Sequence, residues 1–171
     1  MDVRAYEIQT MKEFVDLAVG IPLFTYEMQK NAPRPSGEYA AIKCTSSVNP
    51  GCDESKIVVV DGVEMFQTKG VRILTFQIVF SREGDEYIKY DNSYFRPDVI
   101  AFMKQRGLCA LAKQALNLAS LTLETNWEFR QGIVAQFNVL RIDQTPIGIM
   151  DDASVAGKFI EGDIVTEIKG I

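Results

Sequence analysis

The chain has 171 residues, of which 47% are hydrophobic and 24% charged, and its formal net charge is −5 at pH 7. This length and composition are those of one globular domain, which argues against disordered and fibrous classes. The acidic balance argues against a nonspecific grip on nucleic acid, which needs clustered lysine and arginine. No apolar run approaches the roughly 20 residues that cross a bilayer, and no signal peptide is visible, so we expect no membrane association.

The first third of the chain predicts one helix and two strands. Apolar residues recur at helical spacing over residues 3–18, and Gly20 and Pro22 follow as helix-ending residues. Residues 21–28 predict a strand, and the next strand, over 38–48, places Ala40, Ile42, Cys44 and Val48 on one face. Between these strands, two prolines and a glycine forbid regular structure, which indicates a rigid corner.

The middle of the chain predicts a hairpin and a central strand. Asp61-Gly62 lies between two apolar runs and can supply the positive φ angles of a tight turn. Residues 71–80 alternate, with Leu74, Phe76, Ile78 and Phe80 on one face, as in a central strand covered mainly on one side. Residues 87–95 hold four aromatic side chains mixed with charges; they predict either a wet interface or a half-exposed strand whose rings cover a helix.

The last part of the chain predicts a long helix and two strands. Pro97 suits a first helical turn, and residues 98–123 carry a wide face of leucine and alanine. Strands are expected over residues 132–142 and 158–168. The order predicts an α+β fold, with a mostly antiparallel sheet packed by the N-terminal helix and by one long helix. We expect residues 1–171 to form a single domain.

The sequence offers little catalytic machinery. It contains no histidine, so imidazole-based catalysis is excluded, and its three cysteines predict reduced thiols rather than a zinc site. Paired carboxylates lie next to glycines, where solvated surface charge is typical; among them, Asp151-Asp152 is the pair that a loop cation would most help. We therefore expect no catalytic residue, no metal site and no cofactor. A small metal-dependent enzyme using Asp151 and Asp152, and an adaptor domain, remain the alternatives.

The single tryptophan, Trp127, has two interpretations. It follows the predicted long helix in the segment Glu124 to Gly132. Tryptophan is enriched at binding hot spots, so it could anchor a partner. Alternatively, Trp127 and Phe129 close the end of the core.

One segment carries a more specific signal. The run IPLFTYEMQKNAPRP, followed by the extended EYAAIK, resembles the opening of the phage neck and tail terminator family. The residues that match the proline-rich corner of that family are Gln29, Asn31, Ala32, Pro33, Arg34 and Pro35. The order of the later elements is also similar. The stretch 81–96 departs from the family, because it is larger than the usual connection there.

The resemblance implies a structural virion protein with a tail-terminator-like fold and no enzymatic activity. Family members join head-to-tail into a ring, usually a hexamer, which closes the top of the tail and joins the head connector. The implied partners are portal-side neck proteins, tail tube or sheath proteins, and genomic DNA that passes through the channel without sequence-specific binding. The implied location is the neck or tail of the virion, after assembly in the host cytoplasm. The candidate contact residues are Asn31, Pro33, Arg34 and Pro35.

Overall fold

The computed structural model divides the chain into two compact units. Unit 1 comprises Met1–Glu54 and Lys69–Ile142, and unit 2 comprises Ser55–Thr68 and Asp143–Ile171. The residues that the structure describes are 3–28, 35–81, 85–116, 121–123, 126–128, 131–147, 152–159 and 162–169. The prediction of one domain stays a prediction.

A six-stranded sheet organises the fold, with the order β1-β2-β4-β8-β5 and with β3 pairing β4. Its strands are β1 (Thr25–Glu27), β2 (Ala40–Val48), β3 (Glu54–Val60), β4 (Val63–Phe80), β5 (Leu108–Leu116) and β8 (Gln131–Pro146). β1 pairs β2 in parallel, whereas β2 with β4 and β5 with β8 are antiparallel. The predicted α+β class with a mostly antiparallel sheet is therefore confirmed. The predicted strand over 21–28 is shorter, at Thr25–Glu27.

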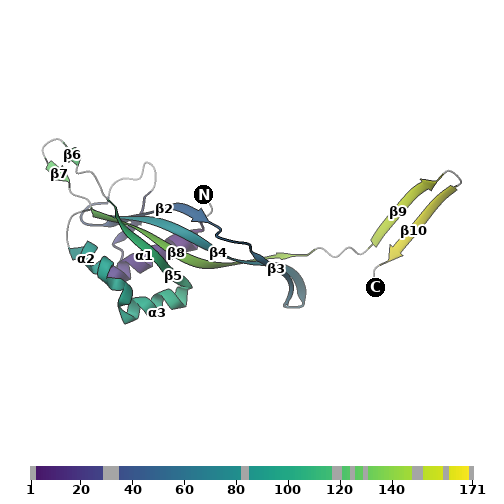
Figure 1. Ribbon diagram of the computed structural model, residues 1–171, viewed down its shortest axis with the longest axis horizontal. Coiled ribbons are helices and arrows are strands. Elements are labelled where there is room, and N and C mark those ends of the chain that lie inside the picture. Colours follow the sequence, from purple (N-terminus) through teal and green to yellow (C-terminus); the bar gives the residue numbers. More distant parts are fainter. Residues whose placement is uncertain are drawn as a thin grey trace. The chain divides into compact units, whose positions relative to one another are not determined.

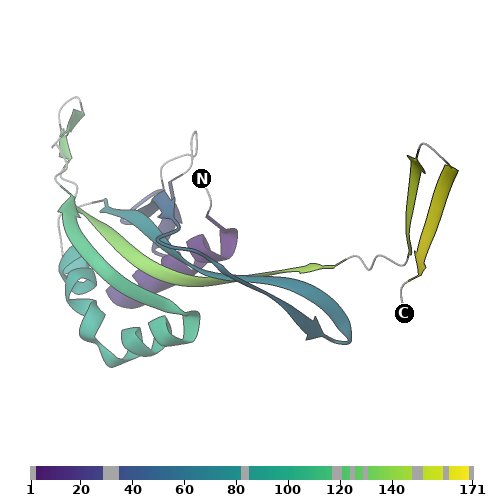
Figure 2. The same cartoon turned by 45° about the vertical axis from the view of Figure 1, so that its right-hand side comes forward.

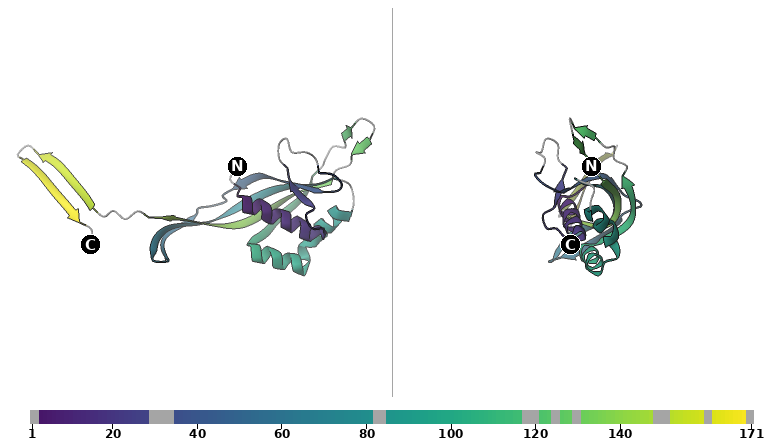
Figure 3. Two further views of the ribbon diagram at one scale, coloured as in Figure 1. Left: turned by 180° about the vertical axis from the view of Figure 1, so that it is seen from behind. Right: turned by 90° about the vertical axis from the view of Figure 1, so that its left-hand side faces the viewer.

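The core of unit 1 lies between the sheet and three helices on one of its faces (Figures 1, 2 and 3). These are α1 (Ala5–Val19), α2 (Asp85–Asn92) and α3 (Pro97–Arg106). The four alternate residues of β4 that predict a core face are all buried: Leu74, Phe76, Ile78 and Phe80. Ala40, Ile42 and Cys44 of β2 are buried as predicted, but Val48 is exposed. The reason is a register shift between Cys44 and Ser46, after which the side chains of β2 point to the opposite faces of the sheet.

The N-terminal helix is confirmed at Ala5–Val19, with Phe14, Val15 and Ala18 buried. The helix ends at Gly20, which adopts the left-handed conformation (φ 83°) that glycine tolerates best. The hairpin between β3 and β4 is also confirmed. Its turn is Asp61-Gly62, with φ angles of 51° and 80°.

The long helix over residues 98–123 is wrong. The helix α3 starts at Pro97, as expected for its first turn, but ends at Arg106; Gly107 then takes a left-handed φ of 65°. The residues from Leu108 to Leu116 instead form β5, which pairs with β8. Alanine and leucine favour helices by less than about 1 kcal/mol each, so the bonds to a neighbouring strand override that preference. As one result, Ala115, which the predicted helix would place on its face of leucine and alanine against the sheet, is exposed.

The half-exposed strand suggested for residues 87–95 is also wrong. Asp85–Asn92 form α2 and Ser93–Phe95 form a 3-10 turn, η1. The Tyr90 and Tyr94 hydroxyls are 2.7 Å apart, and both rings pack edge-on against Phe14. Burial raises the pKa of Tyr90 well above its usual value and that of Tyr94 to about 12. The rings of Tyr90 and Tyr94 therefore pack in the core, whereas the sequence also allowed them to lie at a wet interface.

The C-terminal strand predicted over 158–168 is a hairpin in unit 2. β9 (Asp152–Phe159) pairs antiparallel with β10 (Gly162–Lys169). Two further short strands, β6 (Leu121–Leu123) and β7 (Asn126–Glu128), pair with each other. Trp127 lies in β7 opposite Thr122, and its side chain lies outside the described part of the chain, so both interpretations of it stay open.

The three cysteines provide a direct test of the core. Cys44 is buried, and burial raises the pKa of its thiol, whereas Cys52 and Cys109 are exposed. A thiol reagent at about pH 8 should therefore modify Cys52 and Cys109 rapidly and Cys44 only after denaturation, because the thiolate is the reactive form. A Cys109→Ser control should remove one fast-reacting thiol. Rapid modification of Cys44 in the native protein would show that β2 is not buried here.

Candidate assembly surfaces

The proline-rich corner connects β1 to β2, which are neighbouring parallel strands of unit 1. Asn31, Pro33 and Arg34 lie outside the described residues, and Pro35 is half-buried at the end of the corner. Hydrogen bonds fix both flanks: Met28 N donates to Ile42 O (2.8 Å), and Tyr39 N donates to the Ser81 side-chain Oγ (3.0 Å). The corner therefore starts and ends at fixed points on one edge of the sheet.

A groove lies where the C-terminus of α1 meets the N-terminus of α3. Arg96 closes this junction: its guanidinium donates to Leu17 O (2.7 Å) and Ala18 O (3.1 Å), which are carbonyls at the end of α1. The same guanidinium forms an ion pair with Asp98 (2.8 Å) and holds the pKa of that carboxyl below its usual value. Other residues that line the groove include Glu13, Asp16 and Leu23. Its rim therefore carries three carboxylates and one guanidinium.

Two apolar side chains project at this junction. Among the described residues, Phe95 and Leu23 are the most exposed large apolar side chains, at 88% and 86%. Leu23 lines the groove, and Phe95 directly precedes Arg96, which also lines it. Leu23 has a φ of 56°, in a region that costs a residue other than glycine about 1–2 kcal/mol. We call Leu23 and Phe95 the apolar knob.

The face of the sheet opposite the helices has a different character. On β2, β4, β8 and β5 of unit 1, the side chains that alternate with the core residues include Lys43 and Lys69 and no carboxylate. The rest are amides, hydroxyls and apolar groups. An open cavity of about 350 Å³ on this face is lined mainly by apolar residues, among them Met28, Ala41 and Val79, with Gln77 beside them. We call this cavity and its surround the open sheet face.

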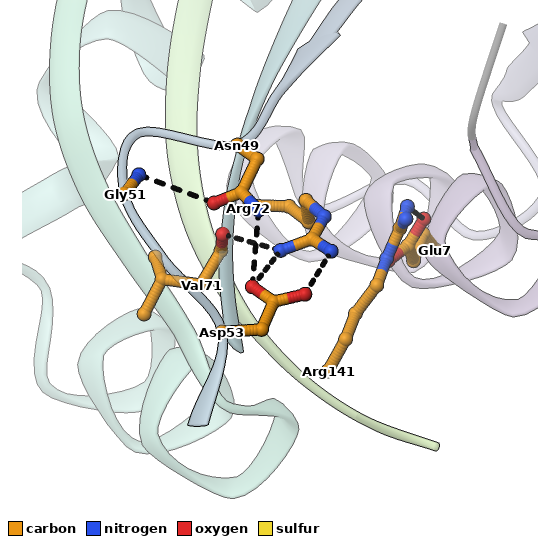
Figure 4. Close-up of polar contacts among 7 residues, drawn as sticks. All are labelled: Glu7, Asn49, Gly51, Asp53, Val71, Arg72 and Arg141. Carbon is orange, nitrogen blue, oxygen red and sulfur yellow. Dashed lines mark hydrogen bonds and ion pairs between the residues drawn. The ribbon is translucent and has the colours of Figure 1, made fainter. Parts of the chain in front are cut away.

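A polar clamp holds the loop before β3 against β4 (Figure 4). The Arg72 guanidinium donates to both carboxylate oxygens of Asp53 (2.8 and 2.7 Å), and Asn49 Nδ2 also donates to Asp53 (3.0 Å). Arg72 holds the pKa of Asp53 below its usual value. A Cβ at Gly70 would lie 1.9 Å from Asp53 Oδ1, so a side chain at this position would displace the Asp53 carboxylate from its bonds to Arg72.

A second ion pair in Figure 4 joins α1 to β8. Arg141 donates to both oxygens of Glu7, each at 2.7 Å, and the two side chains are 4% and 2% exposed. Arg4 N donates to Glu7 as well (2.8 Å). Both oxygens of the Glu7 carboxylate accept hydrogen bonds, and the pair is buried. We therefore interpret it as a structural link between α1 and β8.

Within the described residues, no group of three or more potential metal ligands lies together. Asp151 and the side chain of Asp152 lie outside that part of the chain, so the alternative metal site there is neither supported nor contradicted. No helix among the described residues is long and apolar enough to cross a membrane.

Comparison with known proteins identifies the family. Residues 8–163 match the family described as phage neck terminator protein. The chain belongs to the phage neck terminator family. This match confirms the resemblance that was recognised from the corner and the order of elements, and it extends over nearly all of the sequence. No curated protein matches the chain.

Membership of the neck terminator family identifies a structural component of the phage neck and suggests a role without catalysis. The contact site that the sequence predicts at the corner stays a prediction, and the sequence did not predict the apolar knob. The available signals were Leu23 after a glycine and a proline, and Phe95 two residues before Pro97. Neither position shows, in the sequence alone, that its side chain would be left uncovered.

Proposed function

We propose that the chain assembles head-to-tail into a ring, with six copies as the expected number, that closes the upper end of a phage tail. The ring joins the tail to the head connector and leaves a channel for the genome. The observation that carries this proposal is the match to the phage neck terminator family over residues 8–163. Its partners would be portal-side neck proteins on one side and tail tube or sheath proteins on the other.

The chemistry of unit 1 supports a head-to-tail arrangement. Such contacts need two different, complementary surfaces on each copy, because the surface of one copy meets another surface of the next. Unit 1 carries an acidic groove rim on its helical side and a carboxylate-free face on its sheet. The net charge of −5 also suits a channel that DNA must traverse without being held.

The ring is tested with the purified chain by light scattering and negative-stain electron microscopy. We expect a particle of defined mass that shows rotational symmetry and a central hole. A chain that stays monomeric at high concentration, and that forms no ring when its neck neighbours are added, would contradict the proposal.

Arg34→Glu tests the corner as a subunit contact. We expect the variant to fold, because the residue belongs to the corner between β1 and β2 and not to a strand or helix that forms the core, but to weaken ring closure about tenfold, since charge reversal at a contact costs one or more kcal/mol. Lys104→Glu is the control, because it makes the same reversal on the exposed side of α3. Circular dichroism checks the fold and light scattering the assembly. Equal ring fractions for the two variants would remove the corner from the interface.

A further inference from the structure

The apolar knob has the properties of a docking element rather than of ordinary surface. Single exposed apolar residues are common, but here two large ones flank the same helix junction. Arg96, which follows Phe95, donates to two carbonyls at the end of α1 and pairs with Asp98, so hydrogen bonds hold the backbone beside Phe95 in place. Leu23 also keeps an unfavourable φ of 56°. Strain of this kind persists where the surroundings impose it, and it is concentrated at functional positions.

The open sheet face has the composition expected of a surface that receives such a knob. The cores of protein interfaces are depleted of charged residues. This face lacks carboxylates on four strands of an otherwise acidic chain, and it contains an apolar cavity lined by Met28, Ala41, Val79 and Leu116. The charged side chain next to the cavity is Lys43, which pairs across from Gln77, whereas Lys69 lines a separate hollow together with Glu54. The charge of Lys43 is opposite in sign to that of the carboxylates around the knob.

We propose that the apolar knob of one copy docks on the open sheet face of the next copy, with Leu23 or Phe95 entering the cavity beside Gln77. The proposal rests on the ring proposed above and identifies one interface within it. The occupant is a second copy because one chain presents both halves of the contact: an apolar projection beside a rim of carboxylates, and an apolar cavity beside a lysine. Two different patches that meet in this way form a heterologous contact, which closes into a ring or continues as a filament.

Three variants separate this contact from the fold. Leu23→Asp removes half of the knob, and aspartate tolerates a positive φ better than leucine, so the monomer should fold at least as well. Gln77→Glu adds a carboxylate to the receiving face with almost no change in size. Ile88→Asp is the control, because Ile88 is an apolar residue that is 56% exposed on α2.

Light scattering of the purified full chain should show that Leu23→Asp and Gln77→Glu each weaken assembly at least about tenfold, while Ile88→Asp assembles like the parent. An equimolar mixture of Leu23→Asp and Gln77→Glu is more diagnostic. The intact knob of Gln77→Glu can dock on the intact open sheet face of Leu23→Asp. The two surfaces that remain free in this pair, the altered knob and the altered face, cannot bind a further copy. The mixture should therefore form dimers and nothing larger.

Rings in both single variants would overturn the proposed interface and leave the ring itself standing. Loss of the ring in Ile88→Asp as well would also overturn it, because the effect would not be specific to the knob. A parent chain that forms no ring under any condition would instead refute the proposed function.

Discussion

Replacing Arg141 with leucine will lower the free energy of unfolding by about 3–5 kcal/mol. Arg141 forms two 2.7 Å bonds to Glu7 where both side chains are almost fully buried. Without the guanidinium, the Glu7 carboxylate stays in a site of low dielectric constant with only its remaining bonds. Chemical denaturation of the variant, followed by circular dichroism, measures the loss.

Two controls make this prediction specific. The double variant Glu7→Leu/Arg141→Leu removes both charges and should recover most of the stability, because an apolar pair can replace a buried ion pair. Arg106→Leu breaks an exposed ion pair with Glu13 (2.7 Å) and should cost only about 0–1 kcal/mol. If Arg141→Leu is no worse than Arg106→Leu, α1 and β8 are not joined as described.

Replacing Phe14 with alanine will cost about 3–5 kcal/mol, because it opens a cavity that the neighbouring rings cannot fill. Phe14 is fully buried, and its ring makes edge-on contacts with Tyr90, Tyr94 and Phe137 at 5.4–5.9 Å between centroids. The contacts come from α2, η1 and β8, so this one side chain joins three parts of unit 1.

Phe95→Ala is the matched control, since it removes the same side chain from a position that is 88% exposed. Its unfolding free energy should change by no more than about 0.5 kcal/mol in dilute, monomeric protein. Thermal and urea unfolding of both variants test the difference. A small effect at Phe14 would mean that α1 does not pack on the sheet as described, and a large effect at Phe95 would mean that its side chain is not exposed as described.

The sequence predicts those parts of the fold whose pattern arises from burial on one side. Alternating residues in β4 and β8 and the Asp61-Gly62 turn are local signals that the tertiary structure reinforces. The prediction fails between Leu108 and Leu116, where composition favours a helix. There Gly107 ends α3, and pairing with β8 gives the following residues their structure. Pairing with residues from Gly132 to Val139 leaves no local trace in the sequence of β5 itself.

The candidate surfaces also divide into one that has a local sequence signal and one that depends on the tertiary structure. The corner was recognisable because proline fixes the backbone locally, and Pro35 is its one proposed contact residue within the described chain. The apolar knob was not recognisable, because exposure is a property of the whole arrangement. Phe95 and Tyr94 are adjacent aromatic residues, yet one is almost fully exposed and the other packs on Phe14. Only the placement of α2 and α3 against α1 separates them.

Cryo-electron microscopy of the neck in purified particles of the phage that encodes this chain tests the central claim most directly. We predict a closed ring of copies at the top of the tail, continuous with the tail axis, with a channel through its centre. Neighbouring copies should contact each other through the helix junction of one and the open sheet face of the next. A neck in which the chain is absent, or is bound as single separate copies, would contradict the account.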